Sequence, residues 1–380
     1  MGRGRASLRI PHVGWIMGIY STIVRPLAFR LDPENAHIVA IRTGAKLTPI
    51  AYALRPFFAV SDPRLAATIA GIGFPNPVGL AAGFDKSGEA IETLAALGFG
   101  SVEIGSVSID PSGGNPYPRL FRLPEDRAIV VHYGLPNLGA HAVATRIGGL
   151  KLPVPLGVNL VKTNRGIGAR PESADEIIAE YVDAAHLLAP HADYLMLNLS
   201  CPNTEDGRDF FADQAHLDAC LSAFANVTWR LPIFLKVSPL GGIPTIERVL
   251  MAAAPHDFIK GFMFNLPPGK PAGLRTPEKV WHDMPGAVSG PPAAPLLDQC
   301  LRECYRRMDR NRYALFASGG ISTADDAYTK IRAGASLVQL LTALIYEGPG
   351  VARRITRELV RLIERDGLKS IADAVGADMR

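Results

Sequence analysis

The chain has 380 residues, of which 48% are hydrophobic and 20% charged. This composition suits one large α/β domain of roughly 250 to 300 residues with an appendage. The formal net charge of +4 is too small to indicate nucleic-acid binding. The cysteines follow no disulfide or metal-binding spacing, so we expect reduced thiols and no metal site at Cys201, Cys220, Cys300 and Cys304.

The N-terminal segment is basic and then apolar. Arg3, Arg5 and Arg9 precede the apolar run 13–24, which is shorter than the ~20 residues of a membrane span. Residues 8–46 are predicted to form two short helices, the second capped by Asp32 ahead of Pro33. From the residues alone two interpretations stay open: the helices pack on the main domain, or they lie in a membrane interface.

From about residue 70, short apolar runs alternate with amphipathic segments, the pattern of a parallel α/β fold. Eight such runs predict a barrel of eight strands. They cover residues 78–81, 101–104, 154–159, 194–198, 233–237, 261–265, 314–317 and 336–341.

Helices are expected between these strands and after the last one. Asp85, Ser173 and Ser322 are candidate start residues, whereas Gly98 and Gly334 are suitable stop residues. Residues 106–139 read as a long loop, which in a compact domain is usually functional. The predicted helices cover residues 88–97, 140–147, 174–188, 214–225, 244–254, 295–308, 323–333 and 351–365, with a weak turn at 371–375.

Polar residues stand where the predicted strands end, and parallel barrels build their active sites there. The apolar run 193–199 leads directly to Ser200, Cys201 and Pro202. A thiol at that place could remove a proton, attack an electrophile or be inert, and metal binding is the weakest alternative because no second Cys or His lies at ligand spacing. Lys236 lies inside an apolar strand and needs a partner, such as a cofactor, an anionic substrate or a carboxylate. The Gly319-Gly320 pair suits a phosphate-binding turn as well as an ordinary tight turn.

The motifs together resemble the dihydroorotate dehydrogenase family from about residue 16 to 355. They are 76–86 (NPVGLAAGFDK), 114–122 (GNPYPRLFR), 157–159 (GVN), 198–204 (NLSCPNT) and 318–348. The N-terminal segment 31–37 (LDPENAH) resembles that of the quinone-dependent, membrane-associated class. The resemblance implies an FMN-binding (β/α)8 TIM barrel at 47–380 with a small N-terminal helical extension at 1–46, which forms a quinone tunnel and associates with the membrane.

The resemblance also implies the site residues. Cys201 would be the catalytic base, and dihydroorotate would be bound by Lys86, Asn137, Asn198 and Asn203. FMN would be held by Ala82, Gly83, Lys86, Ser106, Asn159, Asn198, Lys236, Asn265, Gly290, Gly319, Gly320, Leu341 and Thr342. The implied activity is oxidation of dihydroorotate to orotate in pyrimidine biosynthesis, with electrons passed to a quinone. The implied location is cytoplasmic, peripherally on the inner membrane, with no nucleic-acid partner.

Several positions depart from the family pattern. Cys201 replaces the serine usual in the quinone class, and Val131 replaces an asparagine that binds the pyrimidine. Leu266 and Pro267 stand in the segment where the family has Thr-Asn-Thr, and Pro291 replaces an arginine. A divergent paralogue that uses the same flavin on another small cyclic or enoyl substrate is therefore the alternative hypothesis, and an FMN-binding protein without turnover is a further one.

Overall fold

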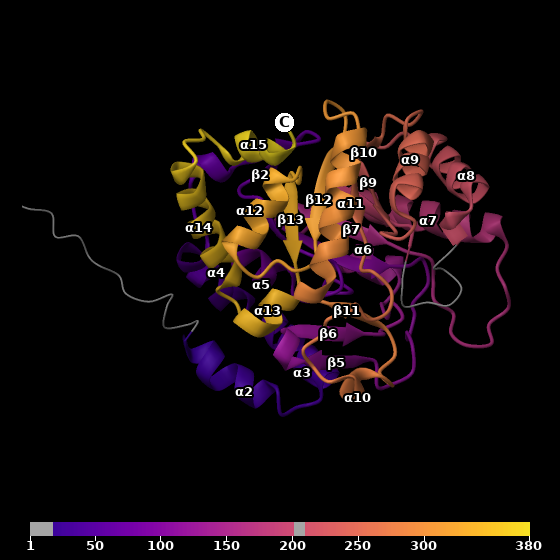
Figure 1. Cartoon of the computed structure of the whole chain (residues 1–380). Coiled ribbons are helices and arrows are strands. Elements are labelled where there is room, and N and C mark those ends of the chain that lie inside the picture. The colour runs from indigo at the N-terminus through magenta and orange to yellow at the C-terminus, as the bar shows by residue number, and fades with distance from the viewer. Residues whose placement is uncertain (1–17, 201–209) are drawn as a thin grey trace, which may run out of the picture.

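The computed structural model describes residues 18–200 and 210–380, and within them eight parallel strands close into a barrel (Figure 1). The strand order around the barrel is β10-β12-β13-β3-β4-β7-β8-β9, with all neighbours parallel. Each predicted strand is present, so the predicted (β/α)8 architecture is confirmed. The bounds are β3 (Val78–Leu80), β4 (Ser101–Val107), β7 (Leu156–Leu160), β8 (Tyr194–Asn198), β9 (Ile233–Val237), β10 (Ile259–Phe264), β12 (Ala314–Ser318) and β13 (Leu337–Leu340).

The strands are mostly apolar because both of their faces are buried, and their few polar residues include those that line the site. On β8, Tyr194 and Met196 belong to the cluster inside the barrel, whereas Leu195 and Leu197 belong to the larger core under the helices. A hairpin of β1 (Ala67–Ile69) and β2 (Ile72–Phe74) precedes the barrel, and its Phe74 joins the interior cluster. The interior is therefore packed with side chains, as in other barrels of this size.

The helices surround the barrel, and their ends follow local capping chemistry. Ser173 and Thr323 each form a capping box, with Glu176 and Asp326. Thr323 rather than the predicted Ser322 therefore caps α12, because its hydroxyl is the one that accepts the Asp326 N–H. The helices are α5 (Ile91–Ala96), α6 (Ala140–Ile147), α7 (Ala174–Leu188), α8 (Gln214–Ala225), α9 (Gly242–Ala253), α11 (Ala294–Arg307), α12 (Ala324–Arg332), α13 (Thr342–Glu347), α14 (Val351–Arg365) and α15 (Ile371–Ala374).

The two predicted helix stop residues are confirmed, whereas one predicted start residue is not. Gly98 and Gly334 follow their helices with φ of 88° and 119°, a left-handed conformation that glycine adopts without strain, so both stop residues are confirmed. Asp85 is not the cap of α5, which begins only at Ile91. Its carboxylate instead accepts the N–H groups of Glu89 and Ala90 in the loop before the helix.

The segment predicted as a long loop contains two short strands. An antiparallel sheet forms from β5 (Leu120–Leu123), β6 (Ala128–Val131) and β11 (Ala287–Ser289). Asp126, in the turn between β5 and β6, connects that hairpin to the segment ahead of β11, because its carboxylate accepts the N–H groups of Arg275 and Thr276. The short elements η2 (Pro63–Leu65), η3 (Pro124–Asp126), η4 (Ala189–His191), η5 (Phe210–Ala212), η6 (Pro291–Ala293), η7 (Ala377–Met379) and α10 (Glu278–Trp281) complete the connections.

The N-terminal helices α2 and α3 lie at the same end of the molecule as this small sheet, whereas α4 packs beside α5 (Figure 1). The N-terminal helices are η1 (Tyr20–Val24), α2 (Arg25–Ala28), α3 (Pro33–Lys46) and α4 (Thr48–Phe58). Asp32 caps α3 as predicted, accepting the N–H groups of Glu34 and Asn35. Of the predicted segment 8–46, residues 8–17 lie outside the described part. None of the described helices is long and apolar enough to cross a membrane.

Candidate active site

A cavity of about 1310 Å³, its open mouth included, lies at the carboxyl ends of the barrel strands. The small sheet contributes Leu120, Ile129 and Val131 to its wall, and helix α3 contributes His37. Twelve of the thirteen residues predicted to hold the cofactor line it: Ala82, Gly83, Lys86, Ser106, Asn198, Lys236, Asn265, Gly290, Gly319, Gly320, Leu341 and Thr342. The thirteenth, Asn159, lies directly behind Ser106.

A row of hydrogen bonds connects the polar residues along the bottom of this cavity. The Ser106 hydroxyl donates to Asn159 Oδ1 at 2.5 Å. Ser106 Oγ in turn accepts from Asn198 Nδ2 at 3.2 Å, and Asn198 Oδ1 accepts from Asn265 Nδ2 at 2.8 Å. Side chains from four different strand ends are therefore fixed relative to one another. Lys236, on the strand beside β8, pairs in register with Asn198 and faces the same cavity.

Lys86 lies where this cavity meets a second one of about 840 Å³ that runs beneath α3. Its Nζ is 3.4 Å from His37 Nε2 and 3.9 Å from the centre of the Tyr133 ring. Burial lowers the pKa of Lys86 to about 8, although Glu34 and Asp85 oppose this shift. Burial, reinforced by the positive charge of Lys86, lowers the pKa of His37 to about 3. At neutral pH a protonated Lys86 therefore faces a neutral His37.

The glycine turn after β12 permits close packing that a side chain would prevent. Gly319 and Gly320 have φ of 81° and 73°, and a Cβ on them would come within 2.3 Å of Leu297 and 2.5 Å of Ala294. The N–H groups of Ser322 and Thr323 are already taken by Asp326. A phosphate at this turn would therefore meet Gly319 and Gly320 rather than the first turn of α12. Thr342, at the start of α13, shares a hydrogen bond of 3.0 Å with Ser289, at the end of β11.

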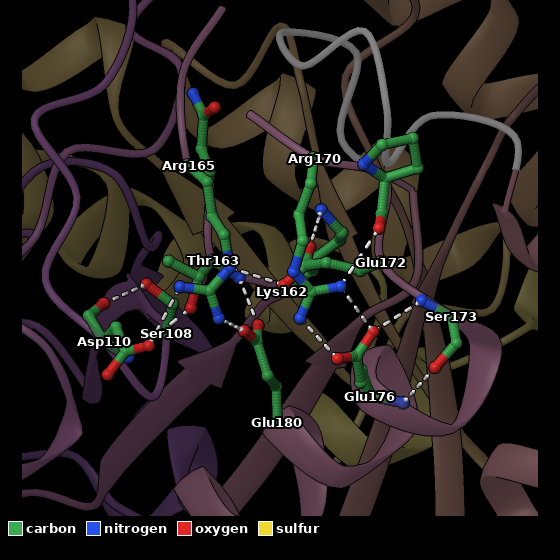
Figure 2. Close-up of polar contacts among 12 residues, drawn as sticks. Ser108, Asp110, Lys162, Thr163, Arg165, Arg170, Glu172, Ser173, Glu176 and Glu180 are labelled. Carbon is green, nitrogen blue, oxygen red and sulfur yellow. Dashed lines mark hydrogen bonds and ion pairs between the residues drawn. The ribbon is translucent and has the colours of Figure 1, made fainter. Parts of the chain in front are cut away.

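A charged cluster fixes the loop that joins β7 to α7 (Figure 2). Lys162 and Arg165 both pair with Glu172 at 2.5 Å, and Arg165 also pairs with Asp110 at 3.1 Å and with Glu180. Asp110 belongs to the segment between β4 and the small sheet. The cluster therefore connects this segment with the outer helix α7, and every charge in it has a partner of opposite sign.

Comparison with known proteins identifies the family. A model of the family described as dihydroorotate dehydrogenase matches residues 64–363. The chain belongs to the dihydroorotate dehydrogenase family. It is 41% identical to the Sphingopyxis alaskensis protein named dihydroorotate dehydrogenase (quinone), over 93% of this chain and 96% of the relative. A Mycobacterium tuberculosis protein of the same name is 39% identical over 94% of this chain and 98% of the relative.

Solved structures of the family agree with the fold. The Eimeria tenella dihydroorotate dehydrogenase in complex with ferulenol superposes with a TM-score of 0.79 at 32% identity, covering 92% of this chain and 96% of that one. The ligand-free form of the same protein gives 0.75, covering 88% and 98%. The agreement extends over most of the chain.

The residues predicted to bind substrate are not all brought together. Lys86 and Asn198 line the cavity, whereas Cys201 and Asn203 lie outside the described residues. Asn137 lines the second cavity, which Lys86 also borders, and not this one. Its side chain bonds Ser108 and the Leu135 carbonyl and so shapes its own loop.

The structure also places residues that the sequence reasoning did not assign to the site. Of the positions that depart from the family pattern, Val131 and Leu266 line the cavity. His37, Tyr133 and Gln339 line it as well, and no motif reasoning assigned them a role there. The segment 31–37 signals the presence of His37, but only the packing of α3 brings it to Lys86. Among the described residues, no group of three His, Cys, Asp or Glu side chains could hold a metal ion.

Proposed function

We propose that this protein oxidises dihydroorotate to orotate and passes the electrons to a quinone. The observation that carries the proposal is the match, over nearly the full length of the chain, to relatives named dihydroorotate dehydrogenase (quinone). The cavity at the carboxyl ends of the barrel strands, which two lysines and several amides line, supplies suitable chemistry for a flat anionic heterocycle.

FMN is the cofactor we assign to this cavity. The residues present fit it: a turn with two left-handed glycines for the phosphate, the amides of Asn198 and Asn265 along the floor, and Lys236 among them. When bound, FMN supplies the capacity to accept two electrons as a hydride from a substrate carbon. Lys236 would stabilise negative charge on the reduced ring system, because an ammonium and an anion that lie close together stabilise each other.

The substrate would be held by the residues on the Lys86 side of the cavity. Dihydroorotate carries a carboxylate, and the ammonium of Lys86 provides a complementary charge at neutral pH. Asn198 offers amide groups to the pyrimidine ring, and Asn203 takes the same role by its place in the motif. Cys201, two residues after the buried Leu199, is the base we assign to proton removal. A thiol with an ordinary pKa of about 8.5 needs little adjustment for this role.

The quinone and the membrane would meet the protein at its N-terminal helices. Phe29 packs on the apolar cluster of Leu120, Ile129 and Tyr346, so these helices cover an apolar wall that continues into the cavity. Among the described residues, ten of the seventeen exposed large hydrophobic side chains lie between positions 19 and 57, far above an even share. They are Ile19, Ile23, Val24, Leu27, Leu31, Val39, Leu47, Ile50, Leu54 and Phe57.

Such a patch is typical of a surface that lies in a lipid interface. We therefore assign a peripheral location on the cytoplasmic membrane, with the quinone entering from the lipid side.

An anaerobic spectrum tests the proposed activity. The protein is purified in mild detergent, its oxidised flavin band is recorded, and dihydroorotate is added. The band should bleach rapidly and return on addition of a short-chain quinone. A yellow protein that dithionite reduces but dihydroorotate does not would contradict the substrate and leave the cofactor in place.

A further inference from the structure

Glu103 is a carboxylate buried completely inside the barrel, beneath the candidate active site. Its neighbours Val102 and Ile104 on β4 belong to the outer core, so Glu103 faces the interior. It accepts hydrogen bonds from Asn159 Nδ2 at 2.9 Å, the Tyr194 hydroxyl at 3.0 Å and Gln339 Nε2 at 2.8 Å. All three donors are neutral groups. Burying a carboxylate is costly, and these bonds offset only part of that cost.

Both carboxyl oxygens of Glu103 act as hydrogen-bond acceptors, one for Asn159 and the other for Tyr194 and Gln339, and this fixes the orientation of the two amides that contact it. Asn159 must turn its NH₂ toward Glu103, so its Oδ1 faces Ser106 and accepts that hydroxyl. Ser106 Oγ is then available as the acceptor for Asn198 Nδ2, and Asn198 Oδ1 for Asn265 Nδ2. Each donor points toward Glu103 along a row that reaches the cavity at Ser106, Asn198 and Asn265.

A second branch orients Gln339 in the same way. Its NH₂ donates to Glu103, so its carbonyl oxygen is turned away from the carboxylate. Gln339 borders the cavity, and within the described part of the chain no group bonds to that oxygen. An amide oxygen and an amide nitrogen have nearly the same shape, so packing alone would not choose between the two orientations.

We propose that Glu103 is a positioning residue, whose carboxylate determines which end of the Asn159 and Gln339 amides is turned toward the site of the bound cofactor and substrate. The inference rests on the proposed function, since it assumes that FMN occupies the cavity. Glu103 touches neither ligand and acts through Asn159 and Gln339. Hydrogen bonds in a row that ends on a charge also polarise one another, so the carboxylate strengthens the donors and acceptors that a ligand meets.

The test replaces Glu103 by glutamine, which keeps the shape and removes the acceptor-only character. The new NH₂ group would face either Asn159 or Gln339, and one of these amides must turn over. The apoprotein is titrated with FMN by fluorescence quenching. We expect the E103Q variant to bind FMN about 10- to 100-fold more weakly, as when residues that orient metal ligands are removed. Reduction by dihydroorotate at saturating FMN should slow as well.

Unfolding of the apoprotein separates positioning from a structural role. Removing a buried charge should leave E103Q at least as resistant to urea as the wild type. A variant that is less stable but binds FMN normally in its folded fraction would overturn the inference. If E103Q does not fold, E103D takes its place, because it keeps the charge one methylene too far from Asn159 and should also weaken FMN binding.

Glu180 provides the matched control. It is also a buried carboxylate with side-chain and backbone donors, but it belongs to the charged cluster outside the barrel (Figure 2). The E180Q variant should bind FMN like the wild type. Equal FMN affinity in E103Q, E180Q and the wild type would overturn the role of Glu103. No FMN binding by the wild type would instead contradict the proposed cofactor.

Discussion

At the scale of single residues, Lys86 combines a proposed binding role with a buried position that disfavours its charge. It is enclosed between two cavities, and burial holds its pKa at about 8 instead of the ordinary 10.5. The nearby His37 has a pKa of about 3 and stays neutral over the physiological range. Of these two neighbouring groups, Lys86 is therefore the one that changes charge between pH 7 and pH 9.

We predict that the affinity for orotate falls as the pH rises through about 8. Protonated Lys86 attracts the ligand carboxylate, and above its pKa the fraction of protonated lysine falls about tenfold per pH unit. Orotate, the product, is the suitable probe because its binding needs no catalytic base. Spectral titration from about pH 6 to about pH 10 measures the dissociation constant. A dissociation constant that does not change over this range would contradict the assignment.

Cys201 and the buried Cys220 should differ in whether they can take a proton from the substrate. We predict that Cys201→Ala abolishes flavin reduction by dihydroorotate while FMN stays bound, because only the proton acceptor is removed. Stopped-flow reduction measures the rate. Cys220→Ala is the control: burial raises the pKa of Cys220 to about 12, so that thiol is no base at neutral pH. Normal reduction in C201A would show that another group takes the proton.

At the scale of elements, a buried ion pair attaches α3 to the segment ahead of the small sheet. Arg119 donates through Nε and Nη2 to both carboxylate oxygens of Glu34, at 2.8 to 3.1 Å, and both side chains are buried. Its Nη1 also donates to the carbonyls of Gly113 and Asn115. The pair holds α3 in the position that brings His37 to Lys86.

We predict that Glu34→Gln lowers the free energy of unfolding by about 3 to 5 kcal/mol, because it leaves the guanidinium of Arg119 buried without its counter-charge. Urea unfolding measures the change. Glu358→Gln is the matched control, since Glu358 forms an exposed pair with Arg361 and should cost less than about 1 kcal/mol. Equal effects of the two substitutions would contradict this role of the buried pair.

The apolar surface of the N-terminal helices leads to a prediction about lipid. Ile50 and Leu54 on α4 are exposed. Replacing either of them by a charged residue should lower the affinity of the protein for a membrane roughly 10- to 100-fold. We predict that Ile50→Glu with Leu54→Glu prevents flotation with phospholipid vesicles. Dihydroorotate oxidation with a water-soluble dye should continue, because the barrel site is untouched. Met251→Glu, at an exposed position on α9, should float like the wild type. Flotation of the double variant would contradict the proposed membrane face.

At the scale of the whole molecule, the proposed FMN contacts involve every strand of the barrel. Ala82, Gly83 and Lys86 follow β3, Ser106 lies on β4, and Gly290 follows β11 of the small sheet. The remaining residues lie on or directly after β7, β8, β9, β10, β12 and β13. Binding that depends on all eight strands should stabilise the closed barrel as a unit and not one part of it.

We predict that FMN at 100 times its dissociation constant raises the free energy of unfolding by about 2.7 kcal/mol. Urea unfolding of the apoprotein with and without FMN measures this. Riboflavin at the same concentration should stabilise less, because it has no phosphate for the turn at Gly319 and Gly320. Equal effects of the two compounds would contradict the phosphate site at that turn.

The sequence predicted the barrel well, and the reason is local. Strands buried on both faces must be mostly apolar, so a run such as Ile233–Val237, apolar except for Lys236, can be recognised without knowledge of its partners. Helix ends were legible where capping uses neighbouring residues, as at Ser173. The error of one residue at Ser322 arose because two adjacent hydroxyls compete for the same cap, and only backbone geometry selects Thr323.

The small sheet was missed because its pairing is not local. Strand β11 pairs with β6 across more than 150 residues, through the register Val288 to Val130. The site residues divide in the same way, into those that local patterns locate and those that only packing locates. The residues predicted for FMN at the strand ends could be located from the strand pattern and the family motifs, whereas the place of His37 depends on how α3 packs over the barrel.

By itself, the sequence determined the eight strands, their covering helices, the family and the polar residues at the strand ends. Each of these depends on neighbouring residues or on a contiguous motif. Tertiary structure alone decided that helix α3 borders the cavity, that Asn137 bonds its own loop, and that Glu103 lies beneath the amides of the site. These are contacts between segments far apart in the chain, and their geometry is fixed only when the barrel closes.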